Sequence, residues 1–203
     1  MTGIPPMQLT GPWRAVVSSS ARLGSHTFGA AVDAAIASEA MRMLQLVHAG
    51  FSAGGLRRPW HPLSPITLQI RKKLLGFGGS KKLMVSGSLR RAVEARKTGP
   101  GAWFVGVHRS ARGHGGKLVN LAAVHEGPYP TLIPITAKMR KFFMALFLKG
   151  IINAPLRKNR KVLVIHPRPF LKPAYDKTKE GTHRRVLAKV KSFIKRESIR
   201  GGV

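Results

Sequence analysis

The strongest constraint in this sequence is its charge. Among 203 residues there are 36 Lys and Arg residues and 7 Asp and Glu residues, which gives a formal net charge of +29. The excess is uneven, because residues 1–55 carry +1 and residues 56–203 carry +28. A solitary globule with this imbalance repels itself unless anionic or acidic material surrounds it. The composition therefore argues against a free-standing metabolic enzyme.

The size and the apolar content fit one ordinary domain with extensions. Hydrophobic residues make up 43% of the chain, which is enough to bury a core. The sequence has no cysteine, so it offers no disulfide, no thiolate nucleophile and no cysteine-based metal site. No apolar run approaches the roughly 18 residues that a membrane-spanning helix needs. We therefore expect a soluble protein.

The first residues have a composition of their own. Residues 1–25 contain two arginines, several serines and no acid, which is typical of a mitochondrial transit peptide. Pro5, Pro6 and Pro12 would interrupt the amphipathic helix that such a peptide forms. We predict a flexible N-terminal arm over residues 1–26, with the transit peptide as the alternative.

Apolar periodicity and turn residues predict the helices and strands of the remaining chain. Helices are expected where apolar residues recur at steps of three and four or follow a capping residue, at residues 27–48, 64–75, 118–126, 136–149 and 174–197. Strands are expected where β-branched and aromatic residues are bounded by turn signals, at residues 102–107, 131–135 and 160–166. Pro134 marks the second of these as an edge strand, because proline cannot donate to a ladder.

Strands interleaved with helices, without regular βαβ spacing, indicate an α+β fold. We predict a small antiparallel sheet of three to four strands, packed against the N-terminal amphipathic helix and the C-terminal basic helix, with long loops. The single predicted domain covers residues 27–199, and residues 200–203 are predicted to be frayed. Helical spacing puts Asp33 and Glu39 away from the apolar side of the first helix.

No arrangement of polar residues predicts a reaction. His125 and Glu126 are neighbours whose side chains diverge on a helix, and their spacing to the other histidines matches no metal-binding motif. The serines beside Gly87 lack the G-x-S-x-G pattern of a nucleophile, and residues 76–81 lack the spacing of a phosphate-binding loop. We predict no catalytic, cofactor-binding or metal-binding residue, and no enzymatic activity.

The basic excess favours nucleic-acid binding, because Lys and Arg release counterions from a phosphate backbone. This signal has low specificity, since no RRM, KH, zinc-finger or helix-turn-helix signature accompanies it. A basic RNA-binding protein, such as a mitochondrial or other ribosomal protein, is one interpretation of the composition.

Four segments follow one another in an order that is more specific than any one of them. They are a Trp-His-Pro-Leu-Ser-Pro lead-in to a basic helix, a Leu-Met-Val-Ser-Gly-Ser-Leu-Arg-Arg segment, an Ala-Ala-Val-His-Glu-Gly segment and an Ile-His-Pro-Arg-Pro-Phe-Leu loop, at residues 60–65, 83–91, 122–127 and 165–171. Together they resemble the virion morphogenesis, or tail completion, family of tailed bacteriophages over about residues 28–195. The chain departs from the family pattern at Ser86 and Ser88, where a threonine-led version is more usual, and at His166, where isoleucine is commoner.

The resemblance implies a set of residues that hold the fold together or form contacts between subunits. They are Trp60, Gly87, Leu89, Arg90, His125, Gly127, Lys138, Arg140, Pro167, Arg168, Pro169 and Phe170.

Four of the expected local roles have a physical basis. Two prolines fix φ on both sides of Arg168, so its guanidinium should be held in one direction. Phe170 is expected to anchor the loop in the core. Gly87 permits a turn that a side chain would block, and His125 is expected at a helix end.

The resemblance implies a structural virion protein, a ring subunit at the neck or tail top that completes the tail and joins it to the head connector. Its expected partners are copies of itself and other neck and tail proteins, such as the tail terminator, head completion or connector proteins, with non-specific contact to DNA in the channel as a further option. The expected location is the virion, after assembly in the host cytoplasm and without a membrane. The RNA-binding protein is the alternative.

Overall fold

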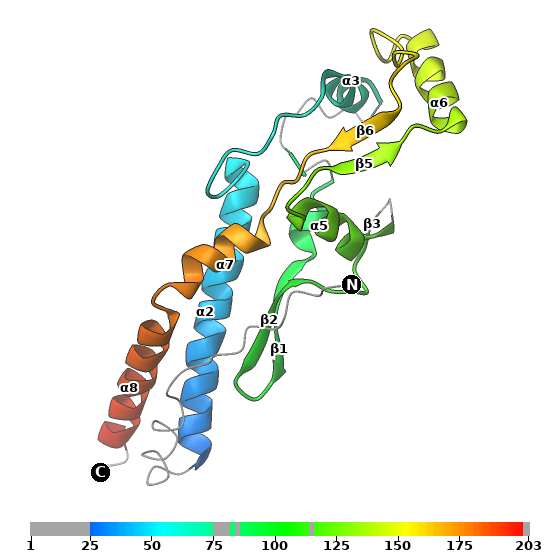
Figure 1. Cartoon of the computed structure of the whole chain (residues 1–203). Coiled ribbons are helices and arrows are strands. Elements are labelled where there is room, and N and C mark those ends of the chain that lie inside the picture. The colour runs from blue at the N-terminus through cyan, green and yellow to red at the C-terminus, as the bar shows by residue number, and fades with distance from the viewer. Residues whose placement is uncertain (1–24, 75–81, 84–85, 114–115, 201–203) are drawn as a thin grey trace. The chain divides into compact units, whose positions relative to one another are not determined.

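The computed structural model describes residues 25–74, 82–83, 86–113 and 116–200. These residues form seven helices and three two-stranded sheets (Figure 1). The predicted arm, apart from its last two residues at the start of the first helix, lies outside the described residues, as do residues 76–81 and 201–203. The helices are α2 (Ser25–Ala53), α3 (Pro65–Leu74), α4 (Ser88–Arg91), α5 (Leu118–Glu126), α6 (Ala137–Leu148), α7 (Leu171–Lys179) and α8 (Thr182–Arg200).

The strands pair as three small sheets. β1 (Val93–Gly99) pairs with β2 (Ala102–Val107), β3 (Arg112–Gly113) with β4 (Gly116–Lys117), and β5 (Thr131–Pro134) with β6 (Val162–Ile165). A mixed fold of helices and small antiparallel sheets is therefore confirmed, and the three predicted strands correspond to β2, β5 and β6. The predicted single sheet of three to four strands is not found in the described part of the chain. Each strand pairs with one neighbour, and β5 ends at Pro134, which has no N–H for a further ladder bond.

The strand β1 was not predicted. Its sequence contains Glu94, Arg96 and Lys97 and lacks the run of β-branched residues that signals a strand. The missed signal is the Pro100–Gly101 pair that leads into β2. Gly101 has φ +65°, which the second central residue of a Pro-Gly turn requires. This turn joins β1 and β2 into a hairpin.

The described residues group into two compact units. Unit 1 consists of residues up to Val47 with Val93–Gly106 and the residues from Ala174 on, and unit 2 consists of His48–Ala92 and Val107–Pro173. Each unit therefore joins segments that are far apart in the sequence.

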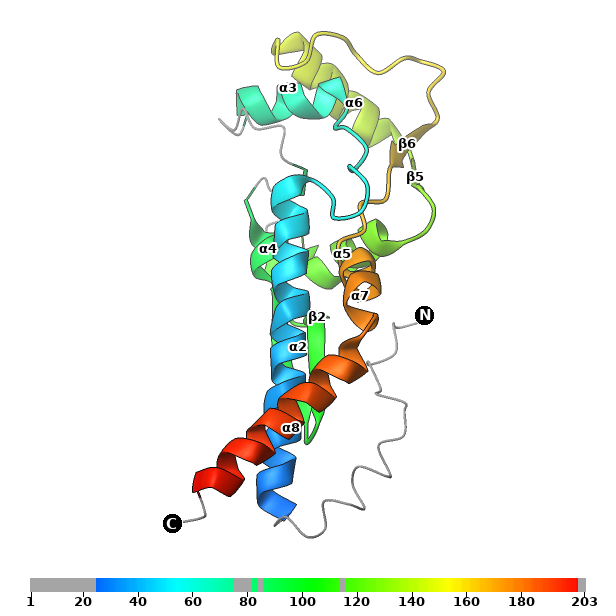
Figure 2. The ribbon, with the colours of Figure 1, turned by 90° about the vertical axis from the view of Figure 1, so that its left-hand side faces the viewer.

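In unit 1, the first part of α2 packs against α8, which lies beside it in Figure 1 and crosses it obliquely in Figure 2. The predicted apolar stripe of α2 is confirmed. It supplies the buried Ala31, Ala35 and Ile36, which pack with Val186 and Val190 of α8. Around this core lie the partly buried Phe28, Val32, Trp103, Phe193 and Ile194.

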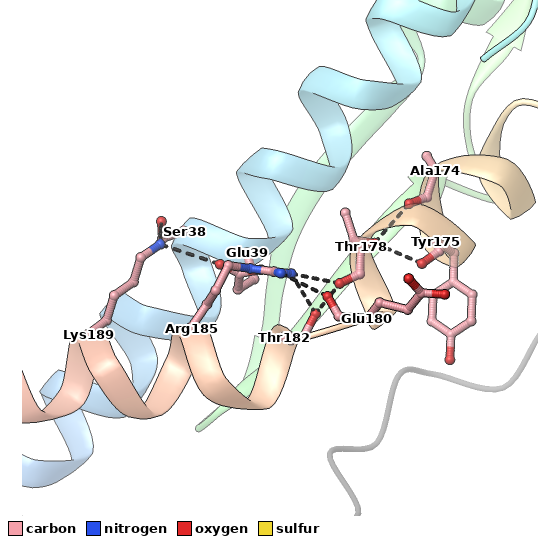
Figure 3. A network of polar contacts seen from close by, with 9 residues as sticks. All are labelled: Ser38, Glu39, Ala174, Tyr175, Thr178, Glu180, Thr182, Arg185 and Lys189. Atoms are coloured by element: carbon pink, nitrogen blue, oxygen red, sulfur yellow. Dashed lines mark hydrogen bonds and ion pairs between the residues drawn. The ribbon is translucent and has the colours of Figure 1, made fainter. Parts of the chain in front are cut away.

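The prediction of one terminal helix over residues 174–197 is wrong, because the structure has the separate helices α7 and α8. Gly181 between them has φ +72°, the left-handed conformation that commonly ends a helix. The Arg185 guanidinium donates to the backbone oxygens of Thr178 at 2.7 Å and Glu180 at 2.8 Å (Figure 3). These bonds satisfy carbonyl groups that the end of α7 leaves without a helical partner.

The prediction that Glu39 lies away from the buried side of α2 is also wrong. Glu39 is 3% exposed and receives hydrogen bonds from Arg185 at 2.8 Å and Lys189 at 3.5 Å (Figure 3). Burial by itself raises the pKa of the Glu39 carboxyl, but its bonds to Arg185 and Lys189 and their charges outweigh burial and hold it below its ordinary value. Unit 1 thus balances part of its basic charge internally.

The core of unit 2 is built around three aromatic residues. The rings of Phe51 and Trp60 meet edge to face with centroids 5.8 Å apart, and those of Phe51 and Phe170 lie 4.9 Å apart. Phe51 and Phe170 are each 1% exposed, so the predicted burial of Phe170 is confirmed. Aromatic pairs in these arrangements stabilise a core beyond the area that they bury.

Candidate functional site at the Arg168 loop

The loop 166–170 belongs to unit 2 and connects β6 to the start of α7. Arg168 is 9% exposed. Its backbone N–H donates to the carbonyl of His125 at 3.0 Å, and its guanidinium donates to the carbonyl of His61 at 3.4 Å. The Trp60 indole N–H donates to the carbonyl of Pro169 at 3.0 Å. Arg168 therefore lies inward, against the lead-in segment that contains Trp60.

His166 has a specific partner in the lead-in segment. Its ring stacks on the ring of His61, with centroids 3.7 Å apart and planes 14° apart. The stacked pair adds a second link between the loop and the lead-in segment. An isoleucine at this position could not stack in the same way.

A functional residue that sequence reasoning missed is Glu126, at the end of α5. Its carboxylate accepts hydrogen bonds from the backbone N–H groups of Phe170 and Leu171, both at 2.7 Å, and of Lys172 at 3.1 Å. These amides begin α7, and the following residue, Pro173, has no N–H. One carboxylate therefore satisfies the donors that the start of α7 leaves open, at the end of the helix dipole that favours negative charge. The sequence signal was the isolation of Glu126, the only acid in the segments of unit 2.

His125 lies at the end of α5, as predicted, and is 4% exposed. Burial lowers the pKa of its imidazole to about 4, with the positive charge of Arg168 acting in the same direction and a hydrogen bond to the His166 backbone acting against both. Its Nδ1 is buried and has no hydrogen-bond partner among the described residues. His125 is therefore neutral at physiological pH.

Arg71 and Arg168 are buried cations of the same unit, 7% and 9% exposed. Burial lowers the pKa of both guanidinium groups, and the charge of Arg71 further lowers that of Arg168. Arginine nevertheless remains protonated in proteins. The hydrogen bonds of the Arg168 guanidinium to the carbonyl of His61 are therefore charge-assisted and help to fix the conformation of the loop.

The second motif segment lies close by, because α4 contacts α5. Gly87 caps the start of α4 and has φ +68°, a left-handed conformation that favours glycine. This agrees with the expectation that Gly87 permits a turn. Leu89 is 3% exposed, and Arg90 is half-buried. Gly127 has φ −60°, and a Cβ there would lie 3.7 Å from its nearest neighbour, which is an ordinary van der Waals contact. The backbone therefore does not require glycine at position 127.

Lys138 and Arg140 both lie in α6. Thr136 caps this helix as predicted, because its hydroxyl accepts the N–H of Met139 at 3.2 Å. Arg140 donates to the backbone oxygens of Arg157 at 3.4 Å and Arg160 at 2.6 Å. Lys138 is exposed. Arg140 thus fastens the segment before β6 to the start of α6.

The described residues contain no group of three or more His, Asp and Glu side chains that could hold a metal ion. In the same part of the chain, no helix is both long and apolar enough to cross a bilayer. A hollow of about 250 Å³ lies beside α3 and is lined by Ile66, Leu156, Arg157 and Arg160 among others. No protein-family model matches the chain, and no curated protein or solved structure is found to be similar to it.

The ionisation of His125 leads to a prediction about pH. The pKa of histidine is about 6.5 in an unfolded chain and about 4 for His125 in the fold. As the pH falls from 6.5 toward 4, the unfolded chain takes up the proton first, so the fold loses stability. The loss attributable to His125 approaches about 3 kcal/mol, because each tenfold difference in proton affinity corresponds to about 1.4 kcal/mol.

Urea unfolding of the unmodified chain and of His125→Gln at pH 7.5 and 4.5 measures this difference. The loss on acidification should be smaller in His125→Gln, which has no proton to gain at this position. Losses of equal size in both proteins would contradict the burial of a neutral imidazole.

Proposed function

We propose that this chain is a structural protein of a tailed bacteriophage, a ring subunit at the neck or tail top that completes the tail and joins it to the head connector. The observation that carries the proposal is the meeting of the segments on which the resemblance depends. The lead-in and the end of α5 each bond directly to the Pro-Arg-Pro-Phe loop at Arg168 or Pro169, and α4 contacts α5. The resembling residues therefore belong to one structural cluster.

An exposed apolar sheet face supports the proposed packing between subunits. Leu132 of β5 is 61% exposed and pairs across the sheet with Val164 of β6, which is 40% exposed. The next outward pair is Pro134 and Val162. A two-stranded sheet is marginally stable by itself, and exposed apolar patches mark interaction sites. In the proposed ring, a neighbouring subunit covers this face.

The charge of unit 2 supports an assembly with anionic or acidic components. Its segments contain nine Lys and Arg residues in His48–Ala92 and thirteen in Val107–Pro173, against the single acid Glu126. The Glu126 carboxylate is already bonded to backbone amides. Partners outside the unit would have to offset its charge. The same observation favours the alternative function, a basic RNA-binding protein.

Assembly of the purified full chain tests the proposal. Light scattering and electron microscopy should show closed rings, and mass spectrometry should find the chain in virions of the phage that encodes it. A monomer at all concentrations together with absence from virions would refute the proposal. Sedimentation with ribosomes would favour the RNA-binding alternative.

A double substitution, Leu132→Glu with Val164→Glu, should convert rings to monomers. Both side chains are exposed, so the melting temperature of the subunit should change little, whereas carboxylates placed in an apolar contact oppose association. Met41→Glu with Tyr175→Glu adds the same charge at exposed positions of unit 1 and should leave rings intact. If the variant with Leu132→Glu and Val164→Glu still forms rings, the subunit contact lies elsewhere.

A further inference from the structure

A basic cluster lies where the start of α6 meets the segment before β6. It consists of Lys138, Arg140, Lys141, Arg157, Lys158, Arg160 and Lys161. All of these residues except Arg140 are exposed. The cluster has a fixed framework, because the Arg140 guanidinium donates to the carbonyls of Arg157 and Arg160, and the N–H of Ile135 donates to the carbonyl of Lys161 at 2.8 Å.

Part of the cluster places positive side chains at the N-terminus of α6, where a helix favours negative charge. The N-terminus of a helix carries partial positive charge and favours acids in its first turn. α6 has no acid there and has Lys138, Arg140 and Lys141 instead. Each cation at this end is unfavourable when no anion is near. A bound anion would turn this unfavourable arrangement into a favourable one.

No carboxylate within unit 2 can serve as that anion. Glu126 is the only acid in its segments, and it bonds to the amides at the start of α7. The cations of the cluster therefore depend on an anion from outside the unit.

We infer that the cluster binds the phosphate backbone of nucleic acid. Duplex DNA carries one negative charge for about every 1.7 Å of its axis, so any stretch of it can meet seven neighbouring cations. A protein partner would have to gather a similar number of carboxylates in one patch. Four of the seven residues are lysines, which bind phosphate as point charges without a fixed pairing geometry. The expected binding is independent of base sequence, because no base-reading element accompanies the cluster.

This inference goes beyond the proposed function and does not depend on it, since the isolated protein can be tested whether or not it forms rings. The probe is a short fluorescein-labelled DNA duplex of mixed sequence, titrated with the full chain and followed by anisotropy between about 0.05 and 0.3 M salt. The test variant is Arg157→Gln, Lys158→Gln and Lys161→Gln combined. These exposed side chains have no role in the contacts that fix the segment, so the melting temperature should not change.

A matched control is needed because any chain with a net charge of +29 attracts DNA. Lys177→Gln, Arg184→Gln and Lys191→Gln combined remove one arginine and two lysines from exposed positions of α7 and α8. The control has the same net charge as the test variant. A difference between the two can therefore come only from where the charges lie.

The test variant should lower the slope of log affinity against log salt by about 3, since each phosphate contact contributes about 1. At 0.15 M salt this corresponds to a loss of affinity of about a hundredfold. The control should keep most of the slope and the affinity. Equal losses in both variants would overturn the inference, and so would the absence of salt-dependent binding. Tighter binding to poly-glutamate than to DNA, abolished in the test variant, would assign the cluster to an acidic protein instead.

Discussion

Phe170→Ala is expected to lower the free energy of unfolding by about 3 to 5 kcal/mol. Phe170 is 1% exposed and its ring lies 4.9 Å from that of Phe51, so truncation removes buried apolar contacts and leaves a cavity. A loss of this size is a large share of the 5 to 15 kcal/mol that stabilises a typical domain. Urea unfolding of the full chain, followed by tryptophan fluorescence, measures it.

Two further variants make this test decisive. Tyr129→Ala truncates an aromatic side chain that is 80% exposed, and it should change stability by no more than about 0.5 kcal/mol. Phe170→Leu keeps most of the apolar volume and should lose less than Phe170→Ala, which gives a measurable protein if the alanine variant does not fold. Stability unchanged in Phe170→Ala would contradict the central position of this ring in unit 2.

Glu126→Ala is expected to cost about 3 kcal/mol, because hydrogen bonds to charged groups contribute about 1.5 to 3 kcal/mol each and water replaces part of what is lost. The substitution leaves the N–H groups of Phe170, Leu171 and Lys172 without their acceptor. Urea unfolding should show the loss of stability. Hydrogen exchange at these three amides should become faster than in the unmodified chain.

Glu94→Ala is the matched control, because Glu94 is an exposed carboxylate of unit 1. It should change stability little and leave the three amides protected. Glu126→Gln keeps one side-chain oxygen, so its loss of stability should lie between those of Glu126→Ala and Glu94→Ala. Protected amides in Glu126→Ala would show that the carboxylate does not cap α7.

Local patterns were sufficient to predict most elements of the fold. The apolar spacing of α2, the turn-bounded strand β2 and the Thr136 cap of α6 each depend on residues close together in the sequence, and each is found in the structure. The break between α7 and α8 depends on Gly181, whose left-handed backbone is supported by contacts of Arg185. That glycine was visible in the sequence, but the contacts that favour a break over a continuous helix were not.

Other errors concern contacts between distant segments. Glu39 lies on the buried side of α2 because Arg185, 146 positions later, donates to it. Helical periodicity describes one helix at a time and cannot reveal such a partner. The same limit explains why β2, β5 and β6 were predicted in one sheet although they lie in two separate pairs, since strand pairing is set by tertiary packing that propensity does not contain.

The sequence pointed to several residues of the candidate site, but it did not predict the hydrogen bonds that join them. The motif order led to Trp60, His125 and the Pro-Arg-Pro-Phe loop, which the structure brings together. Glu126 was passed over because it was assessed as half of a catalytic pair with His125. Its partners are backbone amides 44 to 46 positions away. Every residue except proline has such an amide, so the sequence does not show which amides the carboxylate binds.

The bonds around the Arg168 loop also bear on when the protein can fold during synthesis. The indole N–H of Trp60 donates to the carbonyl of Pro169, which is 109 positions later in the chain. The carbonyl of His61 accepts from Arg168, which is 107 positions later. Contacts this distant form slowly, since a long loop must close before they stabilise anything. Until the ribosome has made Phe170, the emerging chain exposes an aromatic core without its last ring. In that interval a highly basic polypeptide is most open to unwanted association.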